Sequence, residues 1–207
     1  MKRSILIATV ASVLFAVAGN AQTTVSGTID GHDYVDLGLS VKWATCNVGA
    51  SSPEDPGDYF AWGETMAKST YTRKNSKTLD KLLVDVSGNS KYDAACANWG
   101  GSWRIPTKEE MQELIDKCTW TWTTQGGYNG YKVISTINGN SIFLPATGKR
   151  YNSSIQETIR HGFYWSSTPD GYRADWAYNL EFGSSYHRVE SYVCVRRSGQ
   201  CVRPVSD

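Results

Sequence analysis

The residue types best suited to contact a ligand gather in one stretch near the C-terminus. Between Asp170 and Glu190 the chain is rich in Tyr, Ser, Asp and Arg. Such residues give binding surfaces rigid aromatic area and adaptable hydrogen bonds. The alternative is that they are ordinary solvated loop residues. We expect ligand contacts from Asp170, Tyr172, Arg173, Trp176, Asn179, Glu181, Ser184, Tyr186, His187 and Arg188.

A strand is expected inside this stretch, because residues 178–182 alternate between apolar and polar side chains. On this pattern Asn179 and Glu181 lie on the outward face of the strand, and the other candidates come from the flanking loops. His187 is also able to titrate or to bind a metal, although a single histidine in a loop is usually only solvated. Tyr151 lies in another polar segment and is a further candidate for contact.

The five cysteines are the second group with potential chemistry. Their odd number leaves at least one thiol free or paired between chains. Cys194 and Cys201 flank a turn-forming segment at 197–199, so they face each other if the register allows. A two-residue turn would instead place Arg196 opposite Cys201, and both alternatives stay open. Cys46 with Cys118 is the other candidate pair.

No catalytic or metal-binding motif accompanies these residues. The chain has no C-x-x-C pair, and its three histidines are scattered, so no zinc site is expected. The nucleophile elbow, the phosphate-binding glycine loop and the H-E-x-x-H motif are also missing from the sequence. Glu109 and Glu110 are adjacent carboxylates, but they fall in the first turn of an expected helix, where negative charge is stabilised. We expect no enzyme activity, no metal and no cofactor.

Two helices precede these residues. Thr107 and Glu110 form a capping box, and an apolar stripe follows it, which predicts a helix over 108–117. A second apolar stripe that ends before Gly100 predicts a short helix over 91–99.

Strand signals dominate the rest of the chain, and the polar segment 65–91 is expected to be a long irregular loop. A turn is expected at Asn138-Gly139. Strands before the helices and many short strands after them indicate an α+β fold rather than alternating βαβ units. The expected strands lie at 34–39, 41–45, 131–134, 141–145, 164–167 and 193–205.

The N-terminus has the order of a secretory signal peptide. Lys2 and Arg3 precede an apolar run over 5–18, and small residues follow it up to Ala21. The apolar run is shorter than the roughly 20 residues that cross a bilayer, so retention as a membrane anchor is the weaker alternative. We expect residues 1–21 to be removed and the protein to be exported to the periplasm, the cell surface or the medium.

The composition is that of an ordinary globular domain, with 40% apolar and 20% charged residues. We expect a short lead at 22–33 and one domain at 34–207. Because 21 basic and 20 acidic side chains nearly cancel, the net charge of +1 provides no field that would recruit nucleic acid or anionic lipid.

Six ordered motifs occur along the chain: YVDLGL (34–39), WATCNVGA (43–50), GDYFAWGE (57–64), WGGSWRIPT (99–107), YWSS (164–167) and VRPV (202–205). Together they resemble those of one known family, the Fibrobacter succinogenes major paralogous domain, which is common in exported proteins of gut Bacteroidetes. The resemblance extends from about residue 34 to 205. It implies a C-type-lectin-like α+β fold of the formylglycine-generating-enzyme type, with two helices flanking a small, twisted, mostly antiparallel sheet and a loop-rich lobe.

The scaffold motifs contain four tryptophans that are expected in the core, namely Trp43, Trp99, Trp103 and Trp165. Similar lectin-like domains serve as binding proteins whose C-terminal segment is diversified. The sequence motifs of calcium-dependent sugar-binding lectins do not occur here, so calcium-mediated binding is not expected.

The resemblance and the C-terminal composition together predict an exported ligand-binding or adhesion module. Its ligand would be a protein or a glycan, contacted through the C-terminal loops. One alternative is a structural subunit of a surface assembly. The other is an exported enzyme of the formylglycine-generating class that uses Cys194 and Cys201, although no surrounding motif of that enzyme is visible.

Overall fold

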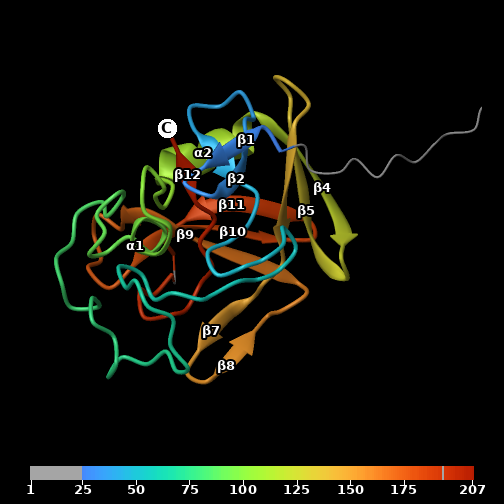
Figure 1. The fold of residues 1–207 in the computed structure, drawn as a ribbon. Coiled ribbons are helices and arrows are strands. Elements are labelled where there is room, and N and C mark those ends of the chain that lie inside the picture. The colour runs from blue at the N-terminus through green and yellow to red at the C-terminus, as the bar shows by residue number, and fades with distance from the viewer. Residues whose placement is uncertain (1–24, 193) are drawn as a thin grey trace, which may run out of the picture.

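A computed structural model describes residues 25–192 and 194–207 of the chain. The signal peptide expected at 1–21 lies outside these residues. The described part contains twelve short strands and two helices (Figure 1). Neither helix has the length and apolar character that a membrane-crossing helix requires, a statement that covers the described residues only.

The strands form four small sheets, and every pairing between strands is antiparallel. Three of these sheets have the orders β1-β2-β3-β12, β4-β5-β6 and β11-β10-β9, and β7 pairs with β8 alone. The bounds are β1 Gly27–Ile29, β2 His32–Val35, β3 Lys42–Ala44, β4 Cys118–Gln125, β5 Tyr128–Ser135, β6 Ser141–Pro145, β7 Lys149–Tyr151, β8 Ser154–Gln156, β9 His161–Pro169, β10 Ala177–Gly183, β11 Tyr186–Glu190 and β12 Val205–Ser206.

This architecture overturns the expected α+β, C-type-lectin-like fold. The two helices have only six and nine residues, and they do not flank a sheet. Most of the regular structure is in small antiparallel sheets instead. The capping signals locate the helices correctly, but helices this short bury few side chains. The core therefore comes mainly from strands and the loops between them.

Helix α2, Lys108–Asp116, confirms its prediction. The Thr107 hydroxyl accepts a hydrogen bond from the Glu110 amide, and the Glu110 carboxylate accepts one from the Thr107 amide. Met111 and Leu114 are the residues of α2 that are buried. Helix α1, Ala94–Trp99, ends before Gly100 as expected but begins three residues later than predicted.

The late start of α1 follows from the buried carboxylate of Asp93. Its oxygens accept hydrogen bonds from the amides of Cys96 at 3.0 Å, Gly88 at 2.8 Å and Ile105 at 2.9 Å. Burial raises the pKa of Asp93, while these hydrogen bonds favour its ionised form. One side chain thus caps α1 and fixes the loop before it and the segment after it.

The expected hairpin at 131–145 is confirmed, with β5 and β6 paired from Gly130↔Pro145 to Ile134↔Ser141. Gly139 in the turn has φ 79°, a conformation that favours glycine. The segment 65–91 is irregular, as expected. Trp43, Trp103 and Trp165 are buried as predicted. Trp99 is only partly buried, and it stacks on His32 at 3.7 Å between ring centroids.

The C-terminal segment, defined as residues 194–206, is not the continuous strand expected over 193–205. Only β12 pairs as a strand, and the rest makes isolated bridges with distant parts of the chain. Val193 itself lies outside the described residues. Because Gln200 pairs with Phe60 and Cys201 with Tyr164, Cys194 and Cys201 do not form a hairpin pair, and all five cysteines are free.

Arg203 anchors this segment in the interior. Its buried guanidinium donates to the carbonyl oxygens of Ala44 at 3.2 Å, Thr45 at 2.6 Å and Pro53 at 3.4 Å, and to Oδ1 of Asn47 at 2.8 Å. Burial lowers the pKa of Arg203. The loop after β3 is thereby tied to the end of the chain.

Substitution of Asp93 tests the structural role of its carboxylate. Asp93→Ala leaves three amides without their acceptor, and we expect a loss of at least about 2 kcal/mol of unfolding free energy, measured by urea denaturation. Asp80→Ala is the matched control, because Asp80 is exposed and paired only with exposed Arg73, so a change within about 0.5 kcal/mol is expected. Equal effects of the two variants would contradict the assignment.

Candidate ligand-binding sites

The structure gathers most of the ten predicted contact residues at two places, and it buries Asn179 between them. Figure 1 shows β9, β10 and β11 crossing the middle of the molecule, between α1 on one side and the β4–β5 hairpin on the other. The loop 170–176 enters β10, and the turn 184–185 leaves it. The seven residues of β10 rise by about 20 Å. The two groups therefore lie at opposite ends of one sheet rather than on one continuous surface.

The loop that enters β10 is organised by Asp170. Its Oδ1 accepts hydrogen bonds from the amides of Tyr172 and Arg173, each at 2.7 Å, and its Oδ2 accepts one from Oγ of Ser191 at 2.5 Å. Burial by itself would raise the pKa of Asp170, but these hydrogen bonds and the Arg173 charge together lower it below its ordinary value. The ionised carboxylate thus fixes the backbone from which Tyr172 and Arg173 project.

The side chains of this loop form an exposed aromatic surface, which we call the loop face and define as Tyr172, Arg173, Trp176 and Tyr192. Tyr172 is fully exposed and Tyr192 is 70% exposed. The Arg173 guanidinium lies 4.1 Å from the Trp176 ring centroid, which is the geometry of a cation–π contact. Trp176 also meets Tyr192 edge-on at 5.7 Å.

Arg196 connects the loop face to the interior. It is buried, its guanidinium lies 4.1 Å from the Trp62 ring centroid, and burial lowers its pKa to about 10. Its Nε donates to the Trp176 carbonyl at 2.9 Å, and its Nη1 donates to the Lys81 carbonyl at 3.0 Å. One side chain therefore positions both the loop face and the neighbouring segment around Lys81.

That neighbouring segment adds apolar surface beside the loop face. Leu82 and Val84 are 91% and 82% exposed. Exposed aliphatic side chains that lie this close together in the chain can mark an interaction surface. Asp85, in the same segment, accepts a hydrogen bond from Oγ1 of Thr168 at 2.8 Å, just before the loop begins. The two segments are thus joined at both Arg196 and Thr168.

At the other end of β10, the hairpin with β11 carries a network of charged side chains. Oε1 of Glu181 accepts from the Tyr186 hydroxyl at 2.7 Å and from Arg188 at 3.4 Å. Arg188 also pairs with Glu190 at 2.8 Å. Burial, followed by the proximity of Glu181, raises the pKa of Glu190. The network leaves Glu181 largely covered, so it offers less to a ligand than predicted.

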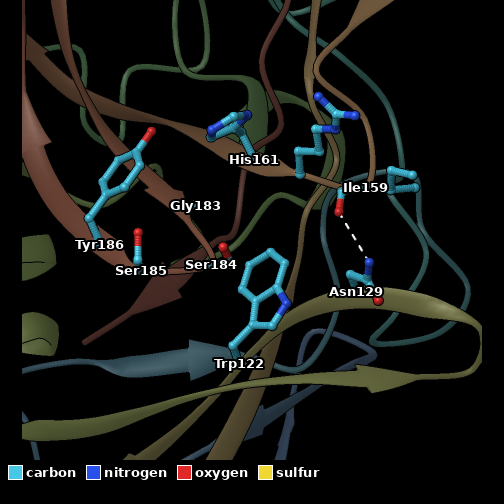
Figure 2. A pocket seen from close by; sticks show the side chains of 9 residues that line it. Trp122, Asn129, Ile159, His161, Gly183, Ser184, Ser185 and Tyr186 are labelled. Atoms are coloured by element: carbon cyan, nitrogen blue, oxygen red, sulfur yellow. Dashed lines mark hydrogen bonds between the residues drawn. The ribbon is translucent and has the colours of Figure 1, made fainter.

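A pocket of about 400 Å³ opens beside this hairpin turn. Three parts of the chain line it: Trp122 and Asn129 from the β4–β5 hairpin, residues 159–161, and the turn 183–186. Figure 2 shows Trp122 on one side and His161 and Tyr186 on the other, with Ser184 and Ser185 between them. The predicted residues Ser184 and Tyr186 therefore line this pocket.

Gly183 gives the pocket its shape. A Cβ at this position would lie 2.8 Å from the Tyr186 ring and 2.9 Å from the His161 ring, so any larger residue would push the two rings apart. His161 Nδ1 lies 3.2 Å from Oε2 of Glu157, without the geometry of a hydrogen bond. A glycine inside a strand pattern often marks such a close approach.

Two predicted contact residues offer less to a ligand than expected, since Asn179 is buried and His187 is half-buried. Asn179 is fully buried rather than outward-facing, because its amide donates to Gln200 Oε1 at 2.9 Å and its Oδ1 accepts from the Cys194 thiol at 3.0 Å. His187 stacks on Trp120 at 4.5 Å, and burial lowers its pKa. The alternation along β10 is correct, but the C-terminal segment covers the face that was expected to be exposed.

Sequence reasoning did not identify several residues of both sites. Trp122 alternates with Trp120 in a strand pattern, which signals a shared face but not a cavity. Arg160 and His161 belong to a polar loop that had no distinguishing signal. Tyr192 lies just beyond the predicted contact stretch. Tyr151, a predicted contact, lies on β7, where its hydroxyl accepts a hydrogen bond from Arg197 at 3.0 Å.

The two cysteines considered for catalysis lie in the interior of the described residues. Cys194 and Cys201 are buried free thiols, and burial raises the pKa of each to about 12. A thiol with so high a pKa is a poor nucleophile at neutral pH, because the thiolate is the reactive form. Among residues 25–192 and 194–207, no three His, Cys, Asp or Glu side chains gather in a way that would hold a metal ion.

Comparison of the chain with models of protein families, with curated proteins and with solved structures finds no match. The sites are therefore interpreted from their own geometry.

The lowered pKa of Asp170 predicts how the loop face responds to acid. Because the pKa lies below its ordinary value of 3.8, the ionised carboxylate stabilises the loop at higher pH, and this contribution is lost as the pH falls through the lowered pKa. We expect the Tyr172 and Arg173 amides to keep their protection from hydrogen exchange down to about pH 4. Asp170→Ala should remove this protection at every pH, and full protection in that variant would contradict the role of Asp170.

Proposed function

We propose that the protein is an exported ligand-binding module that recognises another protein through the loop face. The observation that carries this proposal is the exposed pair Tyr172 and Arg173, held on a backbone that Asp170 fixes in advance. The export component rests on the signal-like sequence at 1–21. The resemblance of the sequence motifs to a family of exported proteins also favours this proposal.

The composition of the loop face is that of an interface hot spot. Tyr, Trp and Arg dominate the binding energy of many interfaces, because each buries a large area with few rotatable bonds. Preorganisation of the loop reduces the entropy lost on binding. Exposed Leu82 and Val84 beside the face favour a protein partner over a glycan, because they offer aliphatic surface that a hydroxyl-rich ligand does not match.

The state of the cysteines supports binding rather than catalysis of the formylglycine-generating kind. That chemistry would require reactive thiols, whereas Cys194 donates a hydrogen bond to buried Asn179 and Cys201 lies in the core. Neither thiol lines the pocket.

The proposal is tested by probing an array of extracellular proteins and glycans with the purified protein. We expect capture by at least one protein, and a loss of affinity of about tenfold or more for Tyr172→Ala and for Arg173→Ala, measured by surface plasmon resonance. Tyr128→Ala is the matched control, because Tyr128 is a partly exposed tyrosine on the β4–β5 hairpin. It should bind as the unmodified protein does.

Two results would overturn the assignment. Capture by glycans alone would exclude a protein ligand, and unchanged binding by the Tyr172 and Arg173 variants would exclude the loop face. Concentration-dependent self-association that Tyr172→Ala abolishes, without binding to any other protein, would support the structural-subunit alternative instead.

A further inference from the structure

The pocket beside the β10–β11 turn combines a positive charge, an aromatic ring and hydroxyl groups. Arg160 supplies a fixed positive charge, and none of the lining residues is a carboxylate. Trp122 provides an aromatic face, and Ser184 and Ser185 provide hydroxyl groups. The pocket is thus suited to a ligand that is at once anionic, rich in hydrogen-bonding groups and apolar on one face.

In the described part of the chain the Arg160 guanidinium has no ion-pair partner. Its side chain is exposed and has no ion pair or hydrogen bond with any described residue. The Glu157 carboxylate lies 3.6 Å from Nζ of Lys149 and 3.2 Å from Nδ1 of His161, which is itself a pocket-lining residue. A ligand carboxylate therefore does not have to displace a protein partner, and the guanidinium can receive it through two parallel hydrogen bonds.

The backbone that carries Arg160 is held in a strained conformation. Glu157 and Ile159 have φ values of 61° and 62°, and this region is a genuine outlier for a β-branched residue such as isoleucine. Ile159 is fixed from both sides, because its amide donates to the Ala146 carbonyl at 3.1 Å and its carbonyl accepts from Asn129 Nδ2 at 3.2 Å. Strain that the surroundings maintain in this way is typical of ligand-binding sites.

The aromatic wall is also rigid. Trp122 packs edge-on against Tyr131 at 5.1 Å and against Phe182 at 6.4 Å between ring centroids. Its ring therefore cannot turn freely, and the face directed to the pocket is available for stacking (Figure 2). The apolar face of a sugar ring packs well on such a surface, while the ring hydroxyls take hydrogen bonds from groups like Ser184.

We propose that this pocket binds a carboxylate-bearing sugar residue, with the pyranose ring on Trp122 and the carboxylate at Arg160. A volume of about 400 Å³ is in the range of small-molecule sites and accommodates one sugar residue of a longer chain. The site is separate from the loop face and does not depend on the ligand of that face.

The test uses the purified protein with the methyl glycosides of glucuronic acid, galacturonic acid and N-acetylneuraminic acid, and with neutral methyl glucoside. We expect at least one acidic glycoside to shift the Trp122 indole resonance in the NMR spectrum and to bind at least about fivefold more tightly than the glucoside. Arg160→Gln should abolish this preference. This variant changes an exposed side chain, so it is expected to fold normally.

Gly183→Ala gives an independent check, because the added methyl group pushes His161 and Tyr186 apart and should weaken every glycoside that binds. Tyr172→Ala is the control and should leave sugar binding unchanged, which separates this site from the loop face. The proposal is overturned if no acidic glycoside shifts Trp122, if the glucoside binds equally well, or if inorganic phosphate at the same concentration displaces the sugar completely.

Discussion

The buried guanidinium of Arg203 is the constraint on which the rest of the structure depends. Among the described residues no carboxylate pairs with it, so its charge is tolerable in the interior only if polar atoms satisfy its donors. The carbonyls of Ala44 and Thr45 and the side chain of Asn47 do so. The end of the chain and the loop after β3 therefore hold each other in place.

A buried guanidinium whose donors are satisfied by carbonyl oxygens also holds the loop face in place. Arg196, seven residues earlier on the C-terminal segment, is a second buried guanidinium, and its hydrogen bonds fix Trp176 and Lys81. Between them the segment bridges to Arg150, Phe60 and other distant strands. These isolated bridges and the two buried guanidinium groups together hold the C-terminal segment in the interior, beneath the loop at 170–176.

The loop face and the pocket lie at opposite ends of one sheet and differ in their chemistry. The loop face is exposed and aromatic, which suits a broad protein surface, whereas the pocket near Trp122 is concave and carries a single free positive charge. The strand β10 joins them, and its side chains Leu180 and Phe182 are buried in the core. Because β10 is held in the core, the loop face and the pocket lie at a fixed separation.

The sequence by itself determined the local elements: α2 from its capping box, the end of α1 at Gly100, and the β5–β6 hairpin. These follow from hydrogen bonds and dihedral preferences within a few residues. Only the tertiary structure decided that the sheets stay small and separate, that Asn179 is covered, and that Arg160 and Trp122 line the same pocket. Those outcomes depend on contacts between segments far apart in the chain, and periodicity along the sequence contains no information about which distant segment covers a given face.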